Sequence, residues 1–346
     1  MAKIFQTFTN DDTITGQTEV ITGTAWSDNS ATLSTFFTSS TQSGSSGFYY
    51  LDVYNKDINS DTTAVSQFSV AYGNIDGSGS LKTTGGRNGD SPTKAIFSQY
   101  KQLLLPEGTT TWTTTDGDGN SRSVKEFYAI NFNRARCKEA LDPGNWELTL
   151  SSSVATVTNA LHLIDNSADT TGTTGIAGKT YEIISGSIGN AGVHTGNQTR
   201  YGSFYPEQGI MILDAGLISS SSMGILAGHG RVSGSDAVDK PAESAKFYNH
   251  IKGGASFKAR NAQQLTCTYY FCRVKNQEFN YSNNPSFVTG SNGTLKHATM
   301  KQNPQTYITT VGLYNNMNEL LAVAKLSKPL LKSFSREALI KVKLEY

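Results

Sequence analysis

A strict alternation of apolar and polar residues over 339–346 constrains the fold more than any other feature of this chain. Val342 and Leu344 belong to the apolar set, and Lys341 and Lys343 belong to the polar set. Successive side chains of a β-strand point to opposite faces, so the pattern predicts a half-buried strand. Its second face is mostly lysine, which is a common way of protecting an exposed sheet edge from pairing with another chain.

Strand patterns run through the rest of the sequence, and helix patterns are few. One helix is predicted over 93–105, where Ser91 can cap the first turn and Pro92 fits it, and a short one is expected at about 240–251. The runs that predict further strands are 48–54, 65–72, 127–132, 146–150, 265–274, 307–314 and 319–326. The chain is therefore predicted to be mainly β, a β-rich α+β fold of antiparallel sheets or a sandwich with one or two short helices.

Shifts in composition predict four segments along the chain. Residues 1–45 are rich in Thr and Ser and are expected to form an exposed, extended N-terminal arm or a pair of strands, followed by a loop. An arm would either wrap a neighbour or be frayed. A β-rich domain with one helix is expected over 46–150. Residues 151–260 contain many glycines and serines, and we predict that they form an inserted β domain. The strands of 261–346 are predicted to complete the first domain.

The low charge of the chain favours a protein that is packed against partners. Charged residues make up 16% of the 346 residues, against a typical share of about 25%, and the net charge is +1. Copies with so little charge repel one another weakly. A nucleic-acid-binding domain normally carries a strong basic excess, so a nucleic-acid partner is not expected.

The cysteines and the apolar runs indicate the kind of cellular compartment in which the chain is expected to fold. No apolar segment follows residues 1–4, so no signal peptide is expected, and no run approaches the roughly 20 apolar residues that span a bilayer. Cys137 lies far from the other two cysteines. Cys267 and Cys272 are five positions apart in a predicted strand, so they point to opposite faces and cannot easily pair. A reducing compartment without a membrane partner fits this pattern.

A calcium-like motif is the sharpest chemical signal in the sequence. Asp116, Asp118 and Asn120 match the first half of a calcium-binding loop. The match then fails, because the sixth position is Ser121 where glycine is needed and the twelfth is Phe127 where glutamate is needed. Asp-Gly and Gly-Asn pairs are also what a tight β-hairpin requires. The preferred interpretation is a hairpin turn, and an adventitious cation site is the alternative.

Other motifs for chemistry are missing or weak. The five histidines, at 162, 194, 229, 250 and 297, share no metal-ligand spacing. Residues 228–231 could hold an anion through backbone N–H groups, although loop geometry explains them as well. No nucleophile elbow, phosphate loop or dinucleotide fingerprint occurs. The sequence therefore predicts no enzyme, and it assigns no catalytic, cofactor-binding or metal-ligating residue and no cofactor.

Several runs resemble virion structural proteins of T4-like marine tailed phages of the cyanophage-type myophages. These runs are 68–73, 93–100, 130–136, 142–146, 303–310, 322–326 and 338–344. The similarity covers about residues 46–150 and 260–346 and leaves the middle unmatched. It implies a tail or baseplate component that assembles with copies of itself and other virion proteins. The expected location is the virion, assembled in the host cytoplasm, and no active residue is implied.

Three functional hypotheses stay open at this point. The first is a structural subunit of the contractile-tail baseplate or tail periphery, in which edge strands and loops make the contacts. The second is a receptor- or glycan-binding module of a fibre or capsid decoration, with variable loops in the Gly/Ser-rich middle binding a host surface glycan. The third is a glycan hydrolase, which needs only two carboxylates at a set separation.

Overall fold

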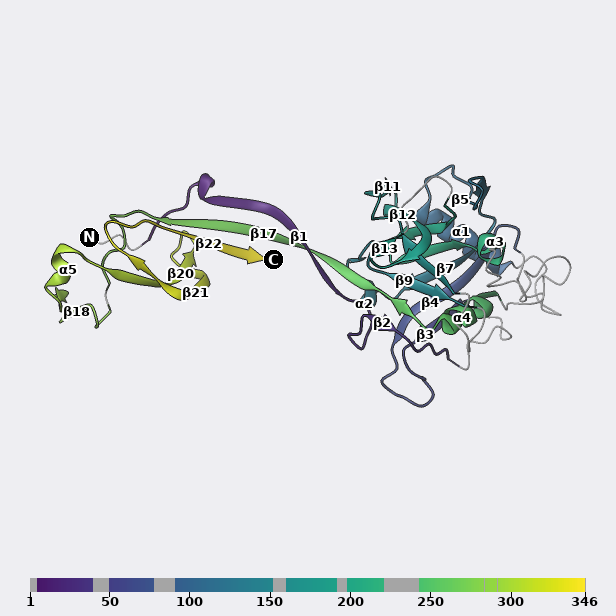
Figure 1. Cartoon of the computed structure of the whole chain (residues 1–346), viewed down its shortest axis with the longest axis horizontal. Helices are drawn as coiled ribbons and strands as arrows, with labels where there is room; N and C mark the ends of the chain where they lie inside the picture. Colours follow the sequence, from purple (N-terminus) through teal and green to yellow (C-terminus); the bar gives the residue numbers. More distant parts are fainter. Residues whose placement is uncertain are drawn as a thin grey trace. The chain divides into compact units, whose positions relative to one another are not determined.

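The structure is a computed structural model. It describes residues 5–39, 50–77, 91–151, 160–191, 198–220, 243–282, 284–290 and 292–345. The chain divides into two compact units: unit 1 is Met1–Val20 with Gln264–Tyr346, and unit 2 is Ile21–Gln263. Two long strands, β1 (Thr13–Thr24) and β17 (Arg260–Val274), continue from one unit into the other (Figure 1).

Unit 2 is built on one large antiparallel sheet. Among the described residues its main path runs β2-β16-β9-β10-β12-β14-β15-β7-β4-β3. The sheet curls until the chain after β2 meets the far edge, where Phe37 and Tyr54 exchange backbone hydrogen bonds of 3.0 and 2.7 Å. The strands on this path are β2 (Thr32–Leu33), β3 (Tyr50–Tyr54), β4 (Ser66–Asn74), β7 (Glu126–Phe132), β9 (Glu147–Leu150), β10 (Leu161–Asp165), β12 (Gly178–Ser187), β14 (Arg200–Tyr205), β15 (Ile210–Asp214) and β16 (Phe257–Lys258).

Shorter elements of unit 2 attach to this path. β5 and β6 form a hairpin that reaches β14, β11 and β13 pair with β12, and β8 pairs with the unit 2 end of β17. Their bounds, with those of the helices, are α1 (Pro92–Leu104), β5 (Thr113–Thr115), β6 (Ser121–Ser123), α2 (Arg134–Cys137), β8 (Ala140–Leu141), β11 (Thr173–Gly175), β13 (Asn190–Ala191), α3 (Ala215–Ser220) and α4 (Glu243–Gly254).

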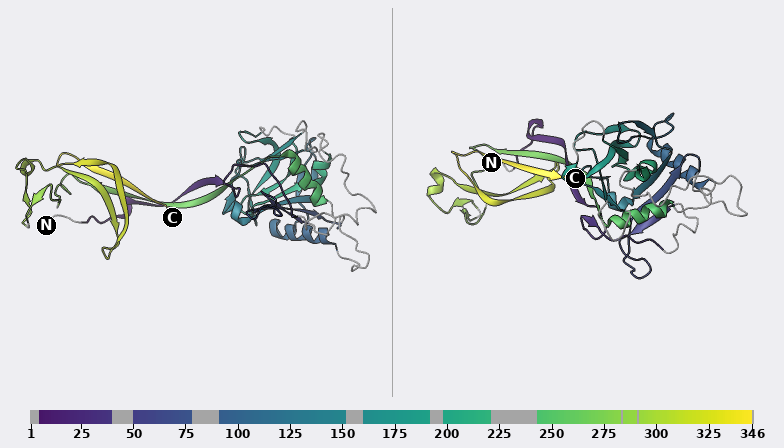
Figure 2. Two further views of the ribbon diagram at one scale, coloured as in Figure 1. Left: turned by 90° about the horizontal axis from the view of Figure 1, so that it is seen from below. Right: turned by 45° about the vertical axis from the view of Figure 1, so that its right-hand side comes forward.

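Helices cover both faces of the central strands of this sheet (Figures 1 and 2). Phe247 of α4 joins a core with Tyr128 and Ile130 of β7, whereas Phe97 of α1 joins a second core with Phe127 of β7. Alternate residues of β7 therefore face different helices. Burial on both faces explains why these strands are apolar almost throughout and do not alternate.

Unit 1 has two layers and a small core. One layer is the unit 1 part of β1 and β17 with β22 (Ala338–Glu345), and the other is the hairpin of β20 (Thr306–Tyr314) and β21 (Leu320–Lys332). The buried residues between them are Leu313, Ile340 and Val342, surrounded by partly buried apolar side chains. The unit is completed by η1 (Asn10–Asp12), β18 (Val288–Thr289), β19 (Thr294–Leu295) and α5 (Thr299–Gln302).

The mainly β fold with antiparallel sheets is confirmed. The predicted hairpin over 307–314 and 319–326 is β20–β21, and the alternating run over 339–346 is β22. The two predicted helices are α1 and α4. The run 146–150 is confirmed as a strand, and all four residues of β9 are buried. Helix α4 packs against the strand, and the His162 and Lys258 side chains contact Glu147.

The division into units differs from the predicted domains. Strands β10, β12, β14 and β15 of the predicted inserted domain (151–260) are hydrogen-bonded into the same sheet as β4, β7 and β9 of the predicted first domain (46–150). The strands of 264–345 do not complete that sheet, because they pair among themselves and with β1.

The predicted N-terminal arm, 1–45, is likewise split between the units. Its residues 5–20 belong to unit 1, and Trp26 lies in the core of unit 2. The Trp26 ring packs against those of Phe68, Phe132 and Phe257, with centroids 5.2–6.2 Å apart. Such aromatic contacts bury a large apolar area, so this part of the segment is structural core and not an exposed arm.

Candidate assembly surface

The outer side of the β1-β17-β22 layer in unit 1 is covered by paired charges. The Lys341 ammonium lies 3.8 Å from the centre of the Tyr269 ring. Glu19 accepts a hydrogen bond of 2.7 Å from the Tyr269 hydroxyl and is ion-paired with Lys343, which also contacts Glu345 at 2.6 Å. The hydrogen bonds from Lys343 and then Tyr269 lower the pKa of Glu19. A face of this kind is well solvated and needs no partner.

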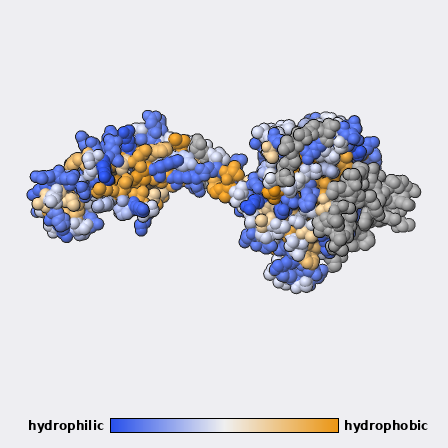
Figure 3. All heavy atoms as spheres, in the orientation of Figure 1, coloured by the Kyte–Doolittle hydropathy of each residue, from blue (hydrophilic) through white to orange (hydrophobic). Residues whose placement is uncertain are grey.

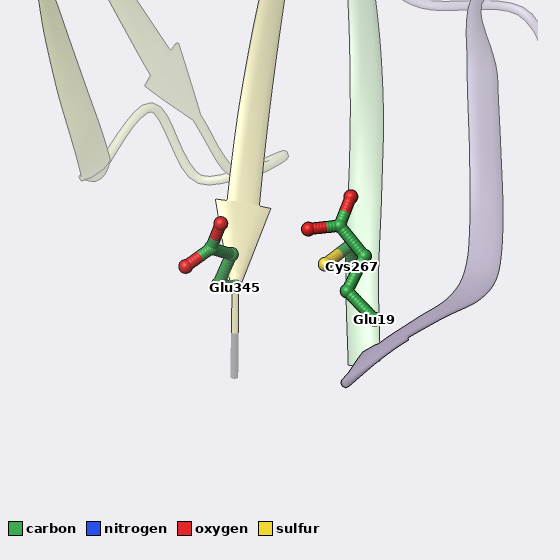
Figure 4. Close-up of side chains that lie close together, drawn as sticks. All are labelled: Glu19, Cys267 and Glu345. Carbon is green, nitrogen blue, oxygen red and sulfur yellow. The ribbon is translucent and has the colours of Figure 1, made fainter. Parts of the chain in front are cut away.

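Three side chains on this face come close enough together to resemble metal ligands. Glu19, Cys267 and Glu345, from three neighbouring strands, offer ligand atoms within 4.8 Å of one another (Figure 4). Lys343 contacts both carboxylates, and its own pKa is raised by those hydrogen bonds. An ammonium group therefore already supplies the positive charge that a cation would bring, and the cluster is best described as an ion-pair network.

The outer side of the β20–β21 hairpin is different in character. Its exposed apolar residues form what we term the apolar face, namely Tyr307, Tyr314, Leu320, Leu321 and Val323. Leu321 is 69% exposed and Val323 is 58% exposed, although both lie in β21, whose pairing with β20 has a register shift at Leu321. Figure 3 shows apolar residues gathered over unit 1 on the side that the view presents.

Neighbouring side chains make the apolar face continuous. A β-carbon added to Gly312 would lie 2.9 Å from the Tyr314 ring and 3.2 Å from Leu320, so these side chains close over the glycine. The Phe5 ring packs edge-on against Tyr314, with centroids 5.1 Å apart, and is itself 46% exposed. Met317, in the turn of the hairpin, is also exposed. Contiguous exposed apolar surface of this kind marks interaction sites on soluble proteins.

The calcium-like sequence forms the predicted hairpin turn, between β5 and β6. One carboxylate oxygen of Asp116 accepts hydrogen bonds from the backbone N–H groups of Asp118 and Asn120, at 3.0 and 2.8 Å. The backbone N–H of Asn120 is the main cause of the lowered pKa of Asp116. Gly119 has a φ of +85°, a conformation that glycine adopts readily. Since its own turn uses the Asp116 carboxylate, these contacts account for the motif without a ligand.

The other weak signals are not brought together into a site. Among the described residues the single group of His, Cys, Asp and Glu close enough to hold a metal is the cluster around Cys267, which contains no histidine. His162 pairs with the buried Glu147 at 3.0 Å, and His250 contacts the Ser151 carbonyl at 3.0 Å. Residues 228–231 and histidines 194 and 229 lie outside the described residues.

Sequence reasoning found the edge lysines of β22 but missed the apolar face of the hairpin. The available signal was in 320–324, where five successive residues are apolar although the strand belongs to a two-stranded ribbon. A ribbon buried on one side needs apolar residues at alternate positions only. The extra apolar residues give this ribbon a second apolar face, which is exposed in the structure.

The helices of the described part of the chain include none with the length and hydropathy needed to cross a membrane. No protein-family model matches this chain, and neither a curated protein nor a solved structure shows significant similarity to it.

Proposed function

We propose that this chain is a non-enzymatic structural subunit of a tailed-phage virion that assembles with other virion proteins and with copies of itself through unit 1. The observation that carries the proposal is the apolar face of the β20–β21 hairpin. Its side chains are exposed in the isolated chain, and covering them in an assembly gains about 25 cal/mol for each Å² removed from water.

The contrast between the two sides of unit 1 supports this proposal. The β1-β17-β22 side carries ion pairs and a cation–π contact, whereas the hairpin side carries tyrosine, leucine and valine. Interface centres are depleted in charge and enriched in aromatic residues. The core of unit 1 is small, and small units bury too little apolar surface to be very stable alone. A partner that covers the apolar face would therefore add to the stability of unit 1.

The assignment of this chain to a tailed-phage particle, and to a location within that particle, rests on the sequence resemblance. The similarity to virion structural proteins of T4-like marine tailed phages favours the contractile-tail baseplate or tail periphery, with assembly in the host cytoplasm. The direct test is an electron-microscopy map of the intact particle, in which we expect density for both units. A chain that stays monomeric and is missing from purified particles contradicts the proposal.

A double substitution tests the role of the apolar face. Leu321→Asn with Val323→Asn is expected to weaken self-association of the full chain by at least tenfold, because two exposed apolar side chains per copy are lost from the contact. Sedimentation velocity over a range of concentrations measures this. Ile176→Asn is the matched control, since Ile176 is an exposed apolar residue of unit 2, at 66% exposure. If wild type, the double variant and the Ile176→Asn control associate equally, the apolar face is not the surface of self-association.

A polar cleft in unit 2 favours recognition of a host surface glycan as a second candidate function. The cleft has a volume of about 460 Å³, within the range of small-molecule sites. Asp169, Thr170 and Thr180 line it, and Arg200 and Glu182 form an ion pair of 2.6 Å at its wall. Carboxylates, hydroxyls and a guanidinium are groups that can hydrogen-bond sugar hydroxyls.

A glycan array measures this second activity. We expect specific retention of the wild-type chain on one glycan class and its loss in Arg200→Ala, because the guanidinium supplies donors to the cleft wall. Lys179→Ala is the control, since it removes a positive charge from the same strand pair without lining the cleft. If the wild-type chain binds no glycan on the array, or binds all of them equally, glycan recognition is not a function of this cleft.

A further inference from the structure

The lining of the polar cleft in unit 2 is held in place by backbone hydrogen bonds. Thr180 and Glu182 occupy alternate positions of β12, so they share one face of the strand, and Tyr181 between them is buried in the core. Asn166 ties the chain after β10 to this strand. Its backbone N–H and side-chain N–H donate to the carbonyl and the carboxylate of Glu182, both at 3.1 Å, and its side-chain oxygen accepts from the Glu182 N–H at 3.0 Å. These residues are therefore in position before a ligand binds.

The charged side chains of this lining leave an excess of acid. One carboxylate oxygen of Glu182 accepts a hydrogen bond of 2.6 Å from the Arg200 guanidinium, and the other accepts from the Asn166 amide. Glu182 thus balances the charge of Arg200, and Asp169 supplies a second carboxylate. With two carboxylates and one guanidinium, the described residues of the lining have a net charge of −1.

A neighbouring turn adds further acid on the side of Arg200. β5 pairs with β14 at Arg200, and the turn directly after β5 contains Asp116 and Asp118. The single basic residue of the β5–β6 hairpin is Arg122, which lies 3.7 Å from the buried Asp214 carboxylate. An anion that approached Arg200 would therefore also approach the carboxylates of this turn.

We propose that the cleft binds an uncharged sugar and rejects acidic glycans, with Arg200 and Glu182 bonding the same sugar hydroxyl or two neighbouring ones. A hydroxyl both donates and accepts, so it can accept from the guanidinium and donate to a carboxylate. The ionised group of an acidic glycan can only accept, and it would meet the charges of Glu182 and Asp169 with no proton to share. The inference rests on the proposed glycan recognition and names the class of glycan.

The state of Arg200 itself favours a neutral ligand. Arginine recognises a carboxylate best when two parallel N–H groups of its fork point at the ligand. In this chain Glu182 already takes a hydrogen bond from one terminal nitrogen of Arg200. The hydroxyl groups of Thr170, Thr173 and Thr180 complete the lining, and each of them can exchange hydrogen bonds with sugar hydroxyls.

Matched pairs of oligosaccharides test the class of ligand on the full chain. Each pair consists of a neutral oligosaccharide and the same molecule with its terminal hexose replaced by the corresponding hexuronic acid. On an array of such pairs we expect the wild-type chain to bind at least one neutral member. Its affinity for that member should exceed its affinity for the acidic member about tenfold or more, because like charges oppose each other in the acidic complex.

Two variants change the charge of the cleft and keep the shape of its side chains. Asp169→Asn with Glu182→Gln changes the net charge of the described lining from −1 to +1 and leaves Arg200 without its charged partner. We expect this double variant to bind the acidic member at least as tightly as the neutral one. Asp169→Asn alone keeps the bonds of Glu182 to Arg200 and Asn166, and it should reduce the neutral preference by a smaller factor.

Glu107→Gln is the control for a change in overall charge. Glu107 is an exposed carboxylate of unit 2 that does not line the cleft, so this variant should show the preference of wild type. A shift as large as that of Asp169→Asn would mean that the net charge of the chain, and not the cleft, sets the preference.

The outcomes separate this inference from the function on which it rests. A wild-type chain that prefers the acidic members, or a preference that both cleft variants leave unchanged, overturns the selection of neutral sugars. Glycan recognition by the cleft still stands in that case if Arg200→Ala loses the binding that wild type shows. A wild-type chain that binds no member of any pair overturns both, and assembly through unit 1 is then decided separately by the association measurements.

Discussion

A chain in which methionine replaces Lys332 is expected to lose about 3 kcal/mol of the unfolding free energy of unit 1. The Lys332 side chain is fully buried, and its ammonium donates hydrogen bonds to the Asn276 carbonyl, the Asn280 side-chain oxygen and the Ser333 carbonyl, at 2.8, 3.0 and 3.1 Å. Methionine fills the space of the aliphatic stem but donates nothing, so three acceptors lose their donor. We expect amide hydrogen exchange to accelerate around residues 276–280 and β21.

The pH dependence of this contribution has a defined sign. Burial lowers the pKa of Lys332 from its ordinary value. Between the lowered pKa and the ordinary value of about 10.4, the unfolded chain binds more protons at this residue than the native chain does. Through Lys332, the unfolding free energy of unit 1 therefore increases as pH rises between these two pKa values. The difference in unfolding free energy between wild type and Lys332→Met should widen over the same pH range.

Lys328→Met is the matched control for this prediction. Lys328 lies on the same strand and is exposed, so its loss should change the unfolding free energy by about 0.5 kcal/mol or less. Equal stability of the two variants would show that the three hydrogen bonds of Lys332 contribute nothing net.

Gly254→Ala is expected to destabilise unit 2 by about 3 kcal/mol. A β-carbon at Gly254, the last residue of α4, would lie 1.9 Å from the carbonyl oxygen of Thr149 in β9. The obstacle is backbone, which cannot turn aside as a flexible side chain can. The helix must therefore move away from the sheet, and with it Phe247 and Ile251, which are buried in the main core. Chemical denaturation followed by tryptophan fluorescence measures the loss.

Gly175→Ala provides the comparison for this clash. Gly175 lies in β11 with no atom within 4 Å of an added β-carbon, and its φ is not positive. We expect a change of about 0.5 kcal/mol or less. A similar loss in both variants would mean that the close approach of α4 to β9 is not the cause.

Local sequence patterns predicted individual elements because their signals are local. The alternation around Val342 corresponds to β22, and Ser91 and Pro92 mark the start of α1. The calcium-like residues after β5 form the hairpin turn because Asp116 bonds the backbone two and four residues on. Each of these features depends on neighbours within a few positions.

The domain division could not be predicted in the same way, because strand pairing is not local. β15, from the predicted inserted domain, pairs with β7 of the predicted first domain through Met211 and Ile130. The residues of β15 and β7 do not specify this pairing, because an apolar strand can pair with many other apolar strands. Trp26 illustrates the same limit, because its Thr/Ser-rich surroundings conceal that it lies in the main core.

The candidate surface was predictable only in part. The lysines of β22 correctly indicated an exposed strand face, and the structure adds that Lys341 and Lys343 are held there by Tyr269 and Glu19. The apolar face required the hairpin to be placed against the small core, which showed that Leu321 and Val323 have no cover within the described chain.

The pairing of β1 with β17 sets an order of events during synthesis. Glu19 meets Tyr269 across 250 residues and Lys343 across 324 residues. Unit 2 can fold when its own residues have left the ribosome, whereas unit 1 must wait for β22. The surface that we assign to assembly therefore takes its final form only after the residues of unit 2 have been synthesised.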